Sequence, residues 1–324
     1  MRAPAAPDAL LAAARSGDRV ALARLLTIVE NDPARTRELA PATWAAAAGE
    51  FSLGITGSPG AGKSTLTDRL ISRALERFVP DAGSAPVSLI GVLCVDPTSP
   101  FSGGAILGDR VRMQDHALDD RVFIRSLATR GHHGGLSIAV PDALAAMSAA
   151  GVGLVVVETV GVGQVELDVA STTTMTAVVV TPGWGDAMQA AKAGILEIAD
   201  LFVVNKADRP GSTDTRRDLD QMLDLGTGRA DGWRPPIVET VATEGTGIDD
   251  VLDAVDAFRA HLRGPAGEQR RLARSASVLR RIAAAGFARR VEELASTAAF
   301  HDAAVAVARG VTDPYTAAAD LLGA

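Results

Sequence analysis

The chain has 324 residues, of which 47% are apolar and 22% are charged, and its formal net charge is −7 at pH 7. A chain of this length and composition can bury a sizeable core, which argues against disorder over most of its length. The acidic balance argues against a nucleic-acid partner, because binding to phosphates requires a basic surface.

Neither the cysteine content nor the start of the chain suggests export. The single cysteine, Cys94, lies within an apolar run, so no internal disulfide can form and a buried structural thiol is expected. Residues 1–20 include charged side chains such as Asp8 and Arg15, and they lack the apolar core of a signal peptide. No run approaches the ~20 apolar residues of a membrane span. We therefore expect a cytoplasmic protein without a membrane partner.

In chain order, the first predicted elements are two helices over residues 8–30, separated at Ser16-Gly17-Asp18, with Asp18 capping the second. Continuous apolar runs then alternate with helical stretches up to about Arg259. The predicted strands are Phe51–Thr56, Val87–Val95, Val122–Ser126, Leu154–Glu158, Ala177–Thr181, Leu201–Asn205 and Ile237–Thr240. Such runs are typical of strands covered on both faces, so we predict a doubly wound α/β fold with a mainly parallel sheet.

After a Gly-Pro-Ala-Gly break at 264–267, the charged and Ala-rich stretch Glu268–Ala298 predicts one or two helices. Its arginines indicate either a solvated face or an arm for dimerisation or partner docking. The predicted organisation is a helical extension over 1–48, an α/β domain over 49–263 and a helical arm over 264–324.

A phosphate-binding loop stands between the first strand and the next helical stretch. Residues 57–64 read Gly-Ser-Pro-Gly-Ala-Gly-Lys-Ser and match the G-x-x-x-x-G-K-[ST] motif. The glycines let main-chain N–H groups and the start of the helix face the β-phosphate. Lys63 would bridge the β- and γ-phosphates and Ser64 would ligate Mg²⁺. The predicted nucleotide contacts here are Gly57, Pro59, Gly60, Ala61, Gly62, Lys63, Ser64 and Thr65.

A second motif, Asn205-Lys206-Ala207-Asp208, follows a predicted strand and has the form N-K-x-D. A carboxylate at Asp208 can accept hydrogen bonds from the ring N–H and the exocyclic amine of guanine, whereas adenine lacks this donor pair. The motif therefore predicts GTP and GDP as ligands. Val241 and Ala242, just beyond another strand, could close over the base, although Val241 replaces the serine usual in such a loop.

Three carboxylates are placed where a metal site would need them. Asp96 and Glu158 end predicted strands, where an open sheet exposes its ligand crevice, and Asp109 follows a Gly-rich segment. With Ser64 they form the predicted Mg²⁺ site, although Asp109 could equally cap a helix. In the segment 160–164, which reads Val-Gly-Val-Gly-Gln, Gly161 would donate its N–H to the γ-phosphate. The candidate catalytic residues are Lys63, Asp109, Glu158, Gln164 and Lys192.

On these residues the chain resembles the MeaB-like GTPases, also called the ArgK or LAO/AO transport system family. The resemblance covers nearly the whole chain and rests on the segments 54–65, 95–99, 103–110, 158–164, 185–186, 192–195 and 313–315. It implies a P-loop domain of the SIMIBI type, homodimers held largely by helical extensions, and Mg²⁺ near Ser64. It also implies a G-protein chaperone of an adenosylcobalamin-dependent acyl-CoA mutase, such as methylmalonyl-CoA mutase.

Three other functions compete with this one. A transport-linked ATPase or kinase fits the older family name, but the N-K-x-D motif speaks against it. A metal-delivery GTPase for nickel or cobalt enzymes would need a Cys/His cluster, which one cysteine and five scattered histidines do not make. A helical interaction protein with an inactive nucleotide site conflicts with the intact Lys63 and Ser64.

Overall fold

The computed structural model describes residues 6–47, 51–78, 89–96, 113, 116, 118–128, 139–159, 165–183, 197–226, 228–229 and 231–323. The chain divides into two compact units, Met1–Arg274 and Ser275–Ala324. The division falls inside helix α11 (Pro265–Ala295) rather than at residue 263. This division into two units does not test the three predicted ranges 1–48, 49–263 and 264–324, which stay a prediction.

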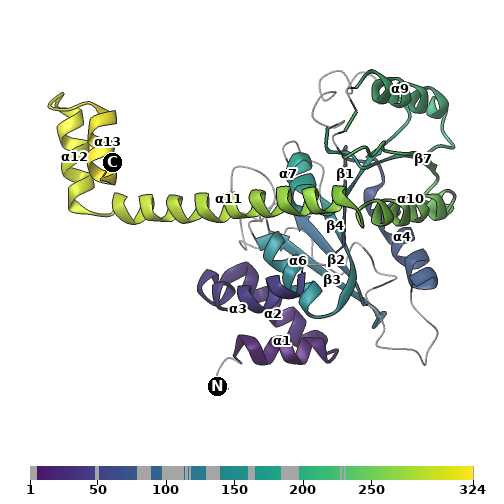
Figure 1. The fold of residues 1–324 in the computed structure, drawn as a ribbon, viewed down its shortest axis with the longest axis horizontal. Helices are drawn as coiled ribbons and strands as arrows, with labels where there is room; N and C mark the ends of the chain where they lie inside the picture. Colours follow the sequence, from purple (N-terminus) through teal and green to yellow (C-terminus); the bar gives the residue numbers. More distant parts are fainter. Residues whose placement is uncertain are drawn as a thin grey trace. The chain divides into compact units, whose positions relative to one another are not determined.

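The first unit contains one sheet, whose strands are all parallel in the described residues (Figure 1). The strands are β1 (Ser52–Gly57), β2 (Leu89–Asp96), β3 (Val122–Ala128), β4 (Val152–Thr159), β5 (Met175–Val180), β6 (Leu201–Asn205) and β7 (Ile237–Thr240). Their order is β3-β2-β4-β1-β5-β6-β7. Each corresponds to a predicted strand, so the α/β fold is confirmed.

Helices cover both faces of this sheet. They are α4 (Lys63–Phe78), α6 (Ala139–Ala149), α7 (Val165–Thr172), α9 (Ser212–Leu225) and α10 (Ile248–His261). On one face, β2 places Ile90, Val92 and Cys94 in a core shared with α4 and α10. On the other, Leu93 and Val95 of the same strand join α6 and α7. This alternation explains why the strands read as continuous apolar runs, and Cys94 is buried as expected.

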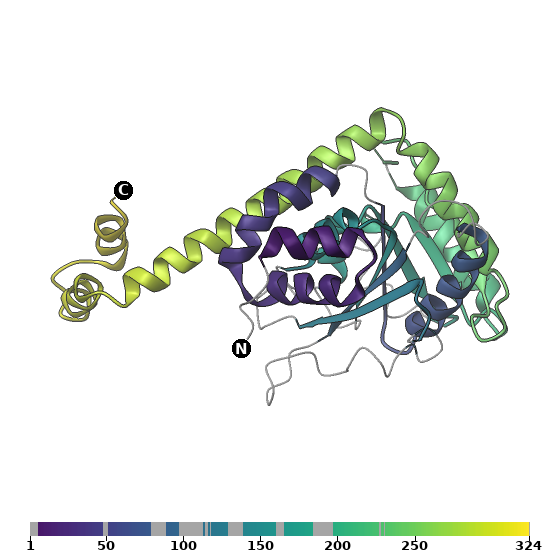
Figure 2. The ribbon, with the colours of Figure 1, turned by 90° about the horizontal axis from the view of Figure 1, so that it is seen from below.

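Three helices precede the sheet: α1 (Pro7–Arg15), α2 (Arg19–Asn31) and α3 (Pro33–Ala46), with the α1–α2 hairpin drawn in purple in Figure 2. Asp18 caps α2 as predicted, accepting from the N–H groups of Val20 and Ala21. Helix α3 was not predicted as a separate element, although it lies within the helical extension predicted over 1–48. Its Pro33 occupies the first turn, where a missing N–H is harmless.

Helix α2 covers the open edge of β3. Arg19 donates to the main-chain oxygens of Asp119 (2.9 Å) and Val122 (2.6 Å). Further along, Glu30 accepts from the main-chain N–H of Ala128 at 3.3 Å and pairs with Arg125 at 2.9 Å. Side chains of the helix thus bind main-chain groups that an edge strand leaves without a partner strand.

The second unit comprises the rest of α11 with α12 (Ala298–Ala308) and α13 (Pro314–Leu322). The predicted helical stretch is one continuous helix that ends at Ala295. Of the helices in the part of the chain that the structure describes, none combines the length and apolarity that crossing a bilayer requires.

Candidate functional site

The phosphate loop joins β1 to α4 and turns at glycines. Gly57, Gly60 and Gly62 have φ values of 136°, 77° and 89°, in the region that favours glycine. A Cβ on Gly57 would lie 2.1 Å from the carbonyl oxygen of Val179. The predicted loop motif is therefore matched by a backbone that other residues cannot adopt without strain.

Lys63 stands at the start of α4 with its side chain inside this loop. The residue is 7% exposed, and its Nζ donates to the main-chain oxygens of Gly57 (2.6 Å) and Ser58 (3.0 Å). Those carbonyls hold the ammonium beside the amides of the first turn of α4. An ammonium and main-chain N–H groups together form a site for phosphate oxygens.

Ser64 meets Glu158 next to Lys63. Strand β4 lies beside β1, with Glu158 opposite Ile55, and the Ser64 hydroxyl donates to a carboxylate oxygen of Glu158. Glu158 is 1% exposed. A hydroxyl and a carboxylate in contact at the end of two strands fit the oxygen ligands that Mg²⁺ prefers. The structure thus brings together two of the four predicted metal ligands.

The other predicted metal and catalytic residues cannot be placed in the same way. Asp96 ends β2, one residue past the pair Val95–Thr159, so its backbone reaches the same sheet edge as Glu158. Its side chain lies outside the described residues, as do Asp109, Gly161, Gln164 and Lys192. Within the described part of the chain, no cluster of three or more His, Cys, Asp or Glu side chains could hold a metal.

Asn205 connects the second motif to the phosphate loop. The residue is 2% exposed, and its side-chain amide nitrogen donates to the carbonyl of Ala61 at 2.8 Å. Its amide oxygen accepts from the Thr240 hydroxyl at 3.1 Å and from the N–H of Ala242 at 3.2 Å. Lys206, whose φ is 61°, donates to the carbonyl of Gly60 at 2.7 Å. The two sequence motifs are therefore one site in space.

The predicted base-binding residues lie in two neighbouring turns. Asp208 lies exposed in the turn after β6, and Val241 and Ala242 follow β7 beside it. The N–H of Ala207 donates to the carbonyl of Thr240 at 3.0 Å, which holds the two turns together. Thr240 was missed as a site residue. Its place at the end of β7, opposite Asn205, depends on strand pairing that the sequence does not show.

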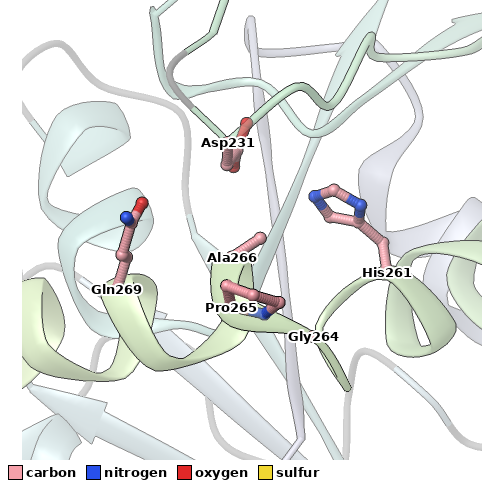
Figure 3. Close-up of a pocket in the computed structure, with 6 residues that line it drawn as sticks. All are labelled: Asp231, His261, Gly264, Pro265, Ala266 and Gln269. Carbon is pink, nitrogen blue, oxygen red and sulfur yellow. The ribbon is translucent and has the colours of Figure 1, made fainter.

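A separate cavity of about 320 Å³ lies where α11 begins (Figure 3). It is lined by Asp231, His261, Gly264, Pro265, Ala266 and Gln269. The side chains of Asp231, His261 and Gln269 face a common space. None of the lining residues belongs to the phosphate loop or the N-K-x-D motif, so this cavity is not part of the nucleotide site.

Near this cavity, a cluster of charges around the buried Asp200 holds the start of α11. Asp200, which is 1% exposed and precedes β6, pairs with Arg229 at 2.7 Å and Arg270 at 2.5 Å. Arg270 also donates to the carbonyl of Thr174, the residue before β5, at 3.0 Å. Since all strands run in the same direction, this cluster marks the amino edge of the sheet, whereas the two nucleotide motifs occupy the carboxyl edge.

Comparisons with known proteins agree with this geometry. Residues 22–296 match the family model described as "Methylmalonyl Co-A mutase-associated GTPase MeaB". A Pyrococcus abyssi protein named as a GTPase is 44% identical over 314 residues, covering 96% of this chain and 94% of its own length. The "Fused isobutyryl-CoA mutase" of Cupriavidus metallidurans is 44% identical over 220 residues, which are 67% of this chain and 19% of that protein.

The same fold is found in the crystal structure of an LAO/AO transport system kinase. Its TM-score is 0.71 at 24% identity, and the match covers 100% of this chain and 98% of that one. At this identity the likeness concerns the fold alone. The family match covers most of the chain, however, and it includes both nucleotide motifs. The chain belongs to the MeaB family of P-loop GTPases.

Proposed function

We propose that this GTPase hydrolyses GTP in a Mg²⁺-dependent reaction at the carboxyl edge of its sheet. The observation that carries the proposal is the contact between Ser64 and Glu158 beside the buried Lys63. Ser64, Glu158, Asp96 and Asp109 would hold the metal ion, which supplies charge neutralisation of the phosphates when bound.

Each part of the site has a separate task. Amides of residues 57–65 and the Lys63 ammonium bind and orient the β- and γ-phosphates, and Gly161 would add an N–H to the γ-phosphate. Asn205 fixes the loop against the base motif. Asp208 selects guanine, with Val241 and Ala242 closing over the base. Gln164, Asp109 and Lys192 are the candidates for the group that positions the attacking water.

We further propose that the protein acts as a chaperone for an adenosylcobalamin-dependent acyl-CoA mutase. The family description names methylmalonyl-CoA mutase, and a fused isobutyryl-CoA mutase carries a segment similar to this chain on the same polypeptide. Fusion of two proteins is a common sign that they act together. GTP hydrolysis would then gate delivery of the cofactor or protect the loaded mutase, by changing the grip of the GTPase on its partner.

A homodimer formed through the C-terminal helices is part of this proposal. Leu279, Ile282, Phe287 and Val291 of α11 are 69%, 51%, 67% and 45% exposed. Exposed apolar side chains at roughly helical spacing on a charged helix indicate a surface that a partner covers. A second copy offers the same surface.

The expected location of the protein is the cytoplasm. The single cysteine is a buried thiol, and such a thiol needs no oxidising compartment.

Isothermal titration calorimetry with GDP and a non-hydrolysable GTP analogue, each with and without Mg²⁺, tests the first proposal. We expect one saturable guanine site and no competition from equimolar ATP. Equal binding of ATP would instead revive a transport-linked ATPase, and the absence of any saturable site would refute the nucleotide site.

Size-exclusion chromatography with light scattering tests the partner and the dimer. We expect a dimeric mass alone and a larger complex with purified methylmalonyl-CoA mutase, whose presence changes the rate of GTP hydrolysis. A monomer refutes the dimer. A mutase that neither binds nor alters the rate refutes the chaperone role for that mutase.

A further inference from the structure

Glu239 of β7 makes a contact beside the base motif that none of the nucleotide motifs includes. The hydroxyl of Ser212, a residue that is 6% exposed, donates to one carboxylate oxygen of Glu239, and Arg216 donates to the other at 3.3 Å. Ser212 is the first residue of α9, and Gly211 before it has no side chain that could cap the helix. The carboxylate of Glu239 therefore lies at the amino end of α9, where the helix dipole favours a negative charge.

The two faces of β7 bind different parts of the chain at this point. Ile237 packs against α9 (Figure 1), and Glu239, two residues further on, lies on the same face of the strand. Thr240 lies on the opposite face, where its hydroxyl donates to Asn205. Two consecutive residues of β7 thus hold the two ends of the segment 205–212, which contains the base motif.

The turn that carries Asp208 is therefore held on both sides of that residue. Before it, the N–H of Ala207 donates to the carbonyl of Thr240 at 3.0 Å. After it, Ser212 is bound to Glu239. Asp208 is exposed and lies between these two contacts. Because the backbone of the turn sets the direction of the Asp208 carboxylate, both contacts bear on where that carboxylate points.

The main chain of Glu239 contacts the second predicted base segment. The N–H of Val241 donates to the carbonyl of Thr246 at 3.1 Å, which closes a loop directly after β7. Gly247, with a φ of 76°, brings this loop back against the strand, and a Cβ there would lie 2.2 Å from the carbonyl oxygen of Glu239. Only glycine fits this approach. Glu239 thus meets the Asp208 turn through its side chain and the loop that starts at Val241 through its main chain.

We propose that Glu239 is a positioning residue for guanine recognition: by binding Ser212, it holds the turn that carries Asp208 in the orientation that accepts both donors of the base. The inference rests on the proposed selection of guanine by Asp208. The described contacts of the Glu239 side chain are with α9 and not with the phosphate loop. Its loss should therefore weaken recognition of the base and spare the grip on the phosphates.

A comparison of GDP with inosine diphosphate (IDP) isolates this role. The two ligands carry the same phosphates, and hypoxanthine keeps the ring N–H but lacks the exocyclic amine of guanine. In the parent protein we expect GDP to bind at least about tenfold more tightly than IDP, because a hydrogen bond to a carboxylate is lost with the amine. In Glu239→Ala, the ratio of the Kd for IDP to the Kd for GDP should fall about threefold, and the Kd for IDP should stay within about twofold of its original value. Fluorescent-nucleotide competition, well below the unfolding transition, measures both constants.

Three further variants show whether the bond to Ser212 is the cause. Glu239→Gln keeps an oxygen that accepts from Ser212 and loses only a partly exposed ion pair with Arg216, so it should recover the parent ratio. Ser212→Ala removes the same bond from the other side and should reproduce the effect of Glu239→Ala, and the double variant should add nothing. In an Asp208→Asn background, Glu239→Ala should not change the ratio further, because the carboxylate that it positions is gone.

Asp224→Ala is the matched control, because it removes a carboxylate that pairs with Arg234 at 2.7 Å near the other end of α9. Its ratio should equal that of the parent. Ser212→Ala decides the test alone if Glu239→Ala folds poorly, since alanine suits a helix.

The proposal is overturned if Glu239→Ala and Ser212→Ala keep the parent ratio, or if GDP and IDP lose affinity by the same factor. It is also overturned if Glu239→Gln stays as low as Glu239→Ala, or if the control falls with them. A parent protein that binds GDP and IDP equally tightly refutes guanine selection by Asp208 itself, and the inference falls with it.

Discussion

The carboxyl and amino edges of the sheet both bury charged groups, but they treat them differently. At the amino edge, Asp200 is enclosed by Arg229 and Arg270, and the N–H of Thr176 donates to it as well. At the carboxyl edge, Lys63 bonds main-chain carbonyls and Glu158 receives a bond from the hydroxyl of Ser64. One cluster pairs formal charges of opposite sign, whereas the described contacts of the other include a bond from each charge to a neutral group.

This difference separates a structural cluster from a ligand site. Two arginines that pair with the buried Asp200, and at longer distance with Asp231, leave little for a ligand to gain, and removing Asp200 would leave both arginines with only their longer pairs. A lysine held by carbonyls can exchange them for phosphate oxygens, which offer it full negative charges. Strand β6 (Leu201–Asn205) begins directly after Asp200 and ends at Asn205, so its five residues connect the two edges. The contrast can be tested by changing single residues at each edge.

The largest expected effect belongs to Lys63→Ala at the carboxyl edge. Loss of the ammonium should weaken GTP binding by at least about 100-fold, because a charge-assisted contact to the phosphates disappears. Calorimetry with a non-hydrolysable analogue measures the change, and Arg217→Ala, in an exposed helix pair with Asp214, is the control. Retained affinity in Lys63→Ala would mean that the carboxyl edge does not bind phosphates through this residue.

At the amino edge, Asp200→Ala should lower the free energy of unfolding by about 2–3 kcal/mol, because the partly buried Arg229 and Arg270 would lose their shared carboxylate and keep only longer pairs with Asp231, at 3.4 Å and 3.5 Å. The affinity of the folded fraction for GDP should not change. Urea denaturation measures the first quantity and nucleotide titration below the transition measures the second. Asp214→Ala, which breaks an exposed pair, should cost less than about 1 kcal/mol. A fall in GDP affinity in Asp200→Ala would show that the two edges are coupled through β6.

Asp208→Asn sharpens the contrast on the base side of the carboxyl edge. An amide donates where the carboxylate accepted, so the preference should move from guanine towards xanthine by roughly 2–4 kcal/mol. Competition between GDP and XDP measures it directly. An unchanged preference would place base selection elsewhere, for example at the main chain of Val241 and Ala242.

Much of the carboxyl edge could be predicted because its residues are local in sequence. The loop at 57–64 and the motif at 205–208 each carry their whole pattern in a few consecutive positions. The strands are long enough for their continuous apolar runs to be recognised in the sequence. Ser64 and Glu158 were each predicted as metal ligands, and the structure adds that they touch.

The amino edge could not be predicted in the same way. Arg229 and Arg270 follow Asp200 by 29 and 70 residues, and none of the three belongs to a motif. Arg270 was interpreted as part of a helix whose arginines form either a solvated face or a docking arm, because only the folded chain shows which side of α11 meets the sheet. Helix α3 was missed for a related reason, since Asp32 caps it and Pro33 fits its first turn, yet both residues also suit a loop.

The smallest expected effect is that of removing the ion pair between Asp119 and Arg121, just before β3. Hydrogen bonds from Arg121 to Asp119 lower the pKa of Asp119 to about 2. Because the folded state has the lower pKa, the carboxylate stabilises the protein above about pH 4, and this contribution is lost as the pH falls towards 2. Solvent screening at this partly exposed pair limits it to about 1 kcal/mol at pH 7. Asp119→Asn should therefore destabilise the protein at pH 7 by that amount in urea denaturation, and by about half as much near pH 3. A difference that does not shrink with falling pH would mean that the asparagine acts through geometry rather than charge, and that pairing at this edge cannot be read from electrostatics alone.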